Sequence, residues 1–138
     1  MSVLLTSCAS VEPFSALQSD VPDLRGVQLV IGTDKSPEGA ATFILVNGSK
    51  LEILYLASDN ETPVYGFQKY VKGDWADSED VAWCANGLHF GRLASGSEVR
   101  FSVGVPKGTR RLGVTIRRSR GSDDDVPLWS PPFNERRI

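Results

Sequence analysis

Short stretches of apolar residues, separated by glycine, proline and polar turns, run along most of this chain. Near-continuous apolar runs occupy residues 27–31, 41–46 and 51–56, and a stretch rich in aromatic residues occupies 64–71. Such runs of four to eight residues, with many β-branched and aromatic side chains, are typical of strands. No segment keeps the helical period over eleven residues. The pattern therefore predicts an all-β protein from Gly26 onward.

Two later segments, 99–105 and 111–117, alternate apolar and polar residues strictly. A period of two places alternate side chains on opposite faces of a sheet. In the second segment the alternation directs the apolar residues inward and points Arg111 and Arg117 to solvent on one face. Arg100 is the outward residue of the first segment. Whether these outer faces form one surface depends on which sheets the strands join.

Turn residues divide these runs from one another. Asn47-Gly48 lies between two apolar runs, which is the strongest short signal for a β-hairpin. Lys72-Gly73-Asp74 predicts another turn, and Pro131-Pro132 ends a short last strand from Leu128 to Ser130. About seven strands without βα alternation indicate a sandwich of two antiparallel sheets. Residues 1–25 are expected to be a signal and tether, and residues 26–138 the β-sandwich domain.

The length of the chain is that of one domain, and its charge is unevenly distributed along the sequence. The chain has 138 residues and a net charge of −2, which is the length of about one domain. Residues 1–91 carry 12 acidic and 5 basic side chains, whereas residues 92–138 carry 5 acidic and 10 basic ones. A basic half can contact phosphate or an acidic surface, but no nucleic-acid motif accompanies it. We therefore expect no nucleic-acid partner.

Three motifs resemble immunoglobulin-like domains of bacteria, including fibronectin type III-like ones. The stretch 43–49 resembles their apolar strand followed by Asn-x-Ser, and 93–101 resembles their Leu-x-Pro-Gly-Glu turn with Ser95 where proline is common. The closing Trp129-Ser130-Pro131-Pro132 is similar to their last strand. The resemblance spans about residues 26–133 and implies an immunoglobulin-like fold, which hosts many functions. It brings no catalytic residues.

The stretch Leu5-Thr6-Ser7-Cys8 resembles a bacterial lipobox, which implies lipid attachment at Cys8. Acyl chains tether a soluble domain because each buried CH₂ contributes about 0.8 kcal/mol. No basic residue precedes Cys8, and the apolar stretch is only Val3-Leu4-Leu5, shorter than the roughly 7–15 residues of a signal. Either a signal extends upstream or the match is chance. If it holds, Ala9 after Cys8 resembles an outer-membrane sorting signal of Gram-negative bacteria.

Candidate reactive and metal-binding groups are weak. Cys84 and His89 could pair as thiol and imidazole, but no third orienting group is evident. A disulfide between Cys8 and Cys84 is an alternative to lipidation. The runs Asp123–Asp125 and Asp74–Asp80 are expected to be solvated acidic loops rather than a Ca²⁺ site or a glycosidase carboxylate pair. We therefore expect no enzyme, no cofactor and no metal.

Aromatic residues offer the best candidate contacts. In a sandwich they are more often core than ligand-binding, so Trp83 and Trp129 are assigned to the core or its edge. Trp75, flanked by polar residues, is the expected exposed one, and Trp75, Arg111 and Arg117 are the candidate ligand contacts. Asn47 and Asn60 stand in formal glycosylation sequons.

The function expected from these features is that of a non-enzymatic, exported cell-envelope domain. It would touch the membrane only through a lipid at Cys8 and would serve protein binding or a structural role. The alternative is a carbohydrate-binding module of the same fold, so the expected partner is a protein or a glycan.

Overall fold

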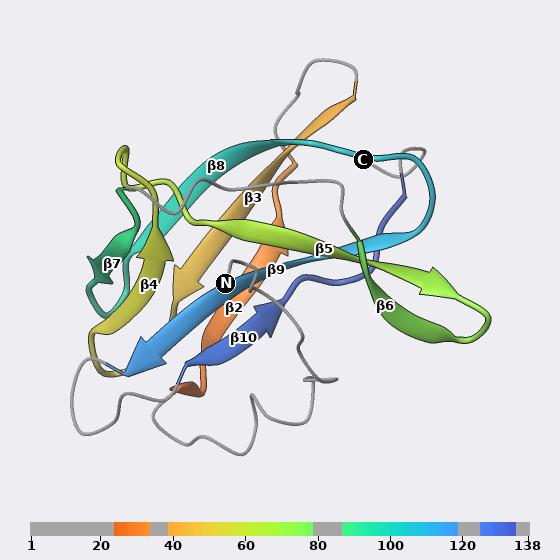
Figure 1. The fold of residues 1–138 in the computed structure, drawn as a ribbon. Coiled ribbons are helices and arrows are strands. Elements are labelled where there is room, and N and C mark those ends of the chain that lie inside the picture. The colour runs from red at the N-terminus through yellow and green to blue at the C-terminus, as the bar shows by residue number, and fades with distance from the viewer. Residues whose placement is uncertain (1–23, 34–38, 79–86, 119–124, 135–138) are drawn as a thin grey trace.

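The computed structural model describes residues 24–33, 39–78, 87–118 and 125–134, and these form nine β-strands (Figure 1). No helix long and apolar enough to cross a membrane occurs in that part of the chain. The strands in chain order are β2 (Val27–Ile31), β3 (Ala40–Asn47), β4 (Ile53–Ala57), β5 (Tyr65–Val71), β6 (Asp74–Ser78), β7 (His89–Leu93), β8 (Glu98–Gly104), β9 (Arg110–Arg118) and β10 (Val126–Trp129).

The strands make two antiparallel sheets. The smaller sheet has the order β2-β3-β8, and in the larger sheet β9 pairs with β5, β4 and β10 while β6 and β7 add at the outside. The first, second and fifth strands of an immunoglobulin domain share one sheet, and the third, sixth and seventh share the other. β2, β3 and β8 match the first group, and β5, β9 and β10 match the second, with β6 as an additional edge strand. The chain is therefore an all-β, immunoglobulin-like antiparallel sandwich, as the sequence predicts.

β4 and β5 lie one after the other along the same side of β9. Tyr55 stands opposite Ile116, and Tyr65 stands opposite Val114. Between them the loop Ser58–Thr62 leaves the sheet and returns, closed by hydrogen bonds from Ser58 N to Thr62 O and from Glu61 N to Ser58 O. The two strands thus act as one strand along β9, and the loop Ser58–Thr62 interrupts it.

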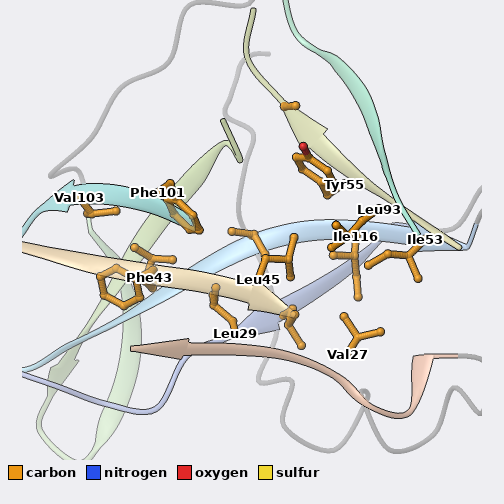
Figure 2. Close-up of a cluster of buried hydrophobic side chains, with 14 of the residues drawn as sticks. Val27, Leu29, Phe43, Leu45, Ile53, Tyr55, Leu93, Phe101, Val103 and Ile116 are labelled. Carbon is orange, nitrogen blue, oxygen red and sulfur yellow. The ribbon is translucent and has the colours of Figure 1, made fainter. Parts of the chain in front are cut away.

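Apolar side chains from both sheets fill the space between them (Figure 2). Phe43 on β3 is fully buried, and its ring centroid lies 6.1 Å from that of Phe101 and 5.4 Å from that of Phe133. Phe67 on the larger sheet lies 6.2 Å from Phe133 in an edge-to-face arrangement. This aromatic cluster joins the two sheets. Leu24, just before β2, is also buried in the core.

The strand boundaries follow the sequence expectations closely in the alternating segments. Leu112, Val114 and Ile116 are buried, as predicted, and β2 spans the predicted 27–31. The described residues form nine strands rather than about seven, because 74–78 and 89–93 are both strands. The sequence pattern missed β7 because its central Gly91 interrupts the apolar alternation.

The hairpin predicted at Asn47-Gly48 is wrong. β3 pairs with β2 and β8, whereas β4 pairs with β7 and β9, so the chain crosses here from one sheet to the other. A type I′ hairpin needs positive φ at both turn positions, and neither Asn47 nor Gly48 has one. The same residues instead make a buried polar junction.

Asn47 is the centre of that junction and is fully buried. Its side-chain amide donates to the carbonyls of Leu51 and Leu93, both at 2.9 Å, and its Oδ1 accepts from the backbone and the hydroxyl of Ser49. Its backbone exchanges hydrogen bonds with the turn between β7 and β8, through Gly96 N and Ser97 O. Two of the motifs that resemble immunoglobulin-like domains are therefore bonded to each other.

Candidate functional site

A groove lies between the edge of β2 that faces away from β3 and the segment that follows β10. It has a volume of about 360 Å³ and is lined by Gln28, Leu29, Val30, Arg111, Trp129, Ser130, Pro131 and Pro132. β10 contacts β2 across the sandwich edge, and Figure 1 shows the two strands side by side. The groove is therefore built where the two sheets meet.

The β2 side of the groove carries main-chain groups that point away from β3. Hydrogen bonds from Gly32 N to Thr42 O and from Gly48 N to Gly26 O show that even-numbered residues exchange bonds with β3. Bonding alternates along an antiparallel pair, so the N–H and C=O groups of Val27, Leu29 and Ile31 point away from β3. No strand of the described part of the chain pairs with that edge.

The segment after β10 continues along β9 beyond the end of the strand. Ser130 N donates to Leu112 O at 2.8 Å, and the Ser130 hydroxyl accepts from Leu112 N at 3.0 Å. Phe133 and Arg110 then form an isolated bridge. Pro131 and Pro132 are exposed between these two anchor points. Since proline has no N–H to donate to a strand ladder, the segment stays at the sandwich edge and forms one wall of the groove.

Arg111 lies on the outer face of β9, the face that the alternation predicts. The expectation that it points to solvent is wrong, because only 8 % of the residue is exposed. Its guanidinium carbon lies 4.6 Å from the ring centroid of Trp75 and 4.5 Å from that of Trp129. A guanidinium over an aromatic face is a favourable cation–π contact. We call Trp75, Arg111 and Trp129 the arginine stack.

Polar side chains of the neighbouring strands hold Arg111 in this stack. Its Nε and Nη2 donate to Gln68 Oε1 on β5 at 3.0 and 2.6 Å. Gln68 Nε2 donates in turn to Asp77 Oδ1 on β6 at 3.0 Å. Burial lowers the pKa of Arg111 from its ordinary value, but a guanidinium stays charged at neutral pH. The stack therefore places a fixed positive charge beside the groove.

Trp129 lies flat against the outer face of the larger sheet. It stands opposite Gly113, and a β-carbon there would come within 2.5 Å of its ring. Trp129 is thus not among the buried residues between the sheets. The signal in the sequence was Gly113 itself, because glycine inside a strand often marks a close approach of another group.

Trp75 is half-buried, because it packs against Tyr70 as well as Arg111. The two aromatic rings meet edge to face with centroids 5.2 Å apart. Tyr70 is 51 % exposed and is the more accessible of the two. Both lie on the hairpin of β5 and β6, which extends beyond the rest of the larger sheet in Figure 1. In the described part of the chain, this pair offers an aromatic surface to solvent.

Arg117 belongs to a separate cluster on β9. Its guanidinium carbon lies 3.9 Å from the ring centroid of Phe90, and its Nη2 pairs with Asp125 Oδ1 at 2.8 Å. Arg117 is six residues from Arg111, which is about 20 Å along a strand. Arg100 lies on β8 in the other sheet. The structure thus brings Trp75 and Arg111 together and leaves Arg117 apart.

The other candidate groups are only partly described. Cys8, Trp83, Cys84 and Asp123–Asp124 lie outside the described residues. The lipid at Cys8, the alternative disulfide, and the expectation of neither a reactive thiol nor a Ca²⁺ site therefore stay predictions. Within the described ranges, no cluster of three or more His, Cys, Asp or Glu side chains could hold a metal ion. His89 contacts Glu61 on the loop that interrupts β4 and β5.

Comparisons with known proteins add a distant structural likeness. No family model matches the chain, and no curated protein matches it. The fold is similar to the ASH / PapD-like domain of human CEP192 (PapD-like domain 7), with 18 % identity, a TM-score of 0.38 and 97 % of each chain covered. That likeness is too distant to bring a function with it. The strand order establishes an immunoglobulin-like β-sandwich, and a groove lies at one edge of it.

Proposed function

We propose that this protein is a non-enzymatic binding domain that takes an extended protein segment along the edge of β2. The observation that carries the proposal is the groove-side edge of β2. No strand of the described residues pairs with this edge, and the main-chain groups of Val27, Leu29 and Ile31 are directed away from β3. An extended segment adds to such an edge through main-chain hydrogen bonds, and neighbouring pockets select its side chains. The groove beside Trp129 and Pro131 supplies such a pocket.

Site-specific photo-crosslinking tests this proposal. A photoreactive amino acid replaces Val30, which lines the groove, in the protein expressed in its native cell. The matched control carries it at Val46, which is on β3 of the same sheet and outside the groove. We expect a discrete protein adduct from position 30 only. Equal adducts from both positions, or none from position 30, would contradict the proposal.

Export and lipid attachment are the second part of the proposal, supported by the lipobox-like residues around Cys8. Mass spectrometry of the membrane fraction, with the protein expressed from its native locus, is expected to show a diacylated or triacylated Cys8. An unmodified soluble chain that retains Met1 would contradict lipid attachment at Cys8. That result would leave the β2-edge proposal standing.

A carbohydrate-binding role is the second candidate, and the exposed Tyr70 beside Trp75 favours it. Sugar rings stack on exposed aromatic faces, and Asp77 next to Gln68 offers a carboxylate for hydroxyl groups. A glycan array compares the natural protein with Tyr70→Ala and Trp75→Ala. Binding that both substitutions abolish would support this candidate, and binding that neither changes would count against it.

A further inference from the structure

We infer that His89 and Glu61 form a pH-sensitive clamp, which fastens the loop Ser58–Thr62 to the start of β7 when His89 is protonated. His89 Nε2 lies 2.6 Å from Glu61 Oε1, and His89 Nδ1 lies 3.2 Å from the carbonyl oxygen of Gly87. The clamp is at the point where the interrupted strand of β4 and β5 leaves the larger sheet. It is separate from the β2 groove.

The chemistry of the two partners fixes the charge of the ring. A carbonyl oxygen and an ionised carboxylate can only accept hydrogen bonds. A neutral imidazole carries one N–H group, so it satisfies one of the two contacts and turns a lone pair toward the other oxygen. Only the imidazolium donates to Gly87 and Glu61 together. The two distances therefore fit the protonated ring, which alone can donate to both oxygens.

The groups around His89 favour this protonated form. The hydrogen bond with Glu61 is the largest cause that raises the pKa of His89, followed by the hydrogen bond to Gly87, while burial opposes it. The Asp59 carboxylate adds a further attraction and occupies the space where a β-carbon of Gly87 would stand. From β4, Tyr55 donates its hydroxyl hydrogen bond to the Glu61 carbonyl at 2.9 Å.

The only other charged pair that spans these elements is, among the described residues, Arg92 with Glu52 at 3.0 Å. Arg92 stands three residues further along β7 than His89, and Glu52 precedes β4 at the opposite end of that strand. The two acidic side chains of the loop therefore decide the protonation of His89.

The direction of the pH response follows from the raised pKa. A histidine with a higher pKa in the folded state stabilises that state fully below its unfolded pKa of about 6.5, and the contribution is lost as the pH rises through the folded value. Glu61 has a φ of 61°, a left-handed backbone that is uncommon for residues other than glycine. Main-chain hydrogen bonds between Ser58 and Thr62 close the loop, and the clamp adds a side-chain contact from Glu61 to β7. We expect the loop to be held at mildly acidic pH and released above it.

Proton NMR tests the clamp directly, because His89 is the single histidine of the chain. In the natural protein we expect its pKa to be above the ordinary value of about 6.5. Glu61→Gln keeps an oxygen acceptor and removes the charge, so it should lower this pKa by roughly half a unit or more. The matched control is Glu52→Gln, which removes the carboxylate paired with Arg92 and should leave the pKa of His89 unchanged.

A second measurement follows the loop itself. The backbone amide signals of Glu61 and Thr62 should titrate with the same midpoint as His89, and this transition should be absent in His89→Asn. Unchanged amide signals of the buried strands show that the variants are folded. A His89 pKa at or below the ordinary value, no response to Glu61→Gln, or loop amides that ignore the titration would each overturn the clamp.

Discussion

At the scale of single residues, the most constrained polar side chain is Asn47. It has no exposed surface, and all its amide hydrogen-bonding groups are used within the fold. A buried amide of this kind is favourable only while each partner stays satisfied. The sequon at Asn47 is therefore closed to glycosylation in the folded protein, whereas Asn60 lies exposed on the loop Ser58–Thr62.

Replacing this side chain should destabilise the protein strongly. Asn47→Ala leaves the buried carbonyl of Leu93 and the amide of Ser49 without their partners, and each such group costs about 1–3 kcal/mol. We expect the free energy of unfolding to fall by about 3 kcal/mol in urea denaturation. Asn60→Ala is the control and should change it by less than about 0.5 kcal/mol. Equal effects of the two substitutions would disprove the structural role of Asn47.

Sequence patterns predicted which face a residue occupies better than how exposed it is. Alternation placed Arg111 on the correct face of β9, because the side-chain period of a strand is local. The burial of Arg111 depends on Trp75 of β6 and Trp129 of β10, which are distant from it in sequence. Likewise, the hairpin predicted at Asn47-Gly48 was wrong, because the long-range bond from Asn47 to Leu93 carries no local signal.

At the scale of strands, the outer face of the larger sheet is shaped by two glycines that stand directly opposite each other. Gly113 on β9 pairs with Gly66 on β5, and Trp129 on β10 covers only Gly113. A β-carbon at Gly66 would meet no atom within 4 Å. The two positions therefore allow a direct comparison, because Trp129 covers Gly113 and no atom covers Gly66.

Substitution of the two glycines by alanine should change the free energy of unfolding differently. Gly113→Ala must push Trp129 away from the strand and weaken its contact with Arg111, so we expect a loss of about 1–3 kcal/mol in the free energy of unfolding and a changed near-ultraviolet circular dichroism. Gly66→Ala should leave stability unchanged or raise it slightly, since glycine weakens a strand interior. The idea fails if Gly113→Ala is as well tolerated as Gly66→Ala.

The strands themselves were largely predictable, whereas their partners were not. The alternation of apolar and polar residues located the strands at 99–105 and 111–117 to within two residues. It does so because burial of one face of a sheet requires this alternation. The chain crosses between sheets after Asn47, and this depends on the length and contacts of the following loop. The edge of β2 with which no described strand pairs could not be predicted at all, because an edge depends on which strands lie beside it.

At the scale of the whole molecule, the aromatic cluster of Phe43, Phe67, Phe101 and Phe133 joins the two sheets. Phe43 is the member from the middle of the smaller sheet and has no exposed surface. Large buried rings contribute much of the energy that holds a sandwich together. The cohesion of the sheets should therefore depend on this position more than on any surface residue.

Truncation at this position tests that dependence. Phe43→Ala should lower the free energy of unfolding by about 3–5 kcal/mol, through lost burial and the cavity left behind. Leu51→Ala removes an apolar side chain that is 55 % exposed and should change it by less than about 0.5 kcal/mol. Thermal and urea denaturation of both variants measure the difference. A small loss for Phe43→Ala would mean that the sheets are held together elsewhere.

The position of β9 also governs the order in which the molecule can assemble during synthesis. β9 pairs with β4, β5 and β10, yet it begins only at Arg110. Until it leaves the ribosome, the hairpin of β5 and β6 and the pair of β4 and β7 have no common neighbour. Pairings between residues distant in sequence form slowly. The growing chain therefore carries the edges of β4 and β5 without their β9 partner from the end of β5 at Val71 until β9 begins at Arg110. A chaperone that shields exposed strands would act in this interval.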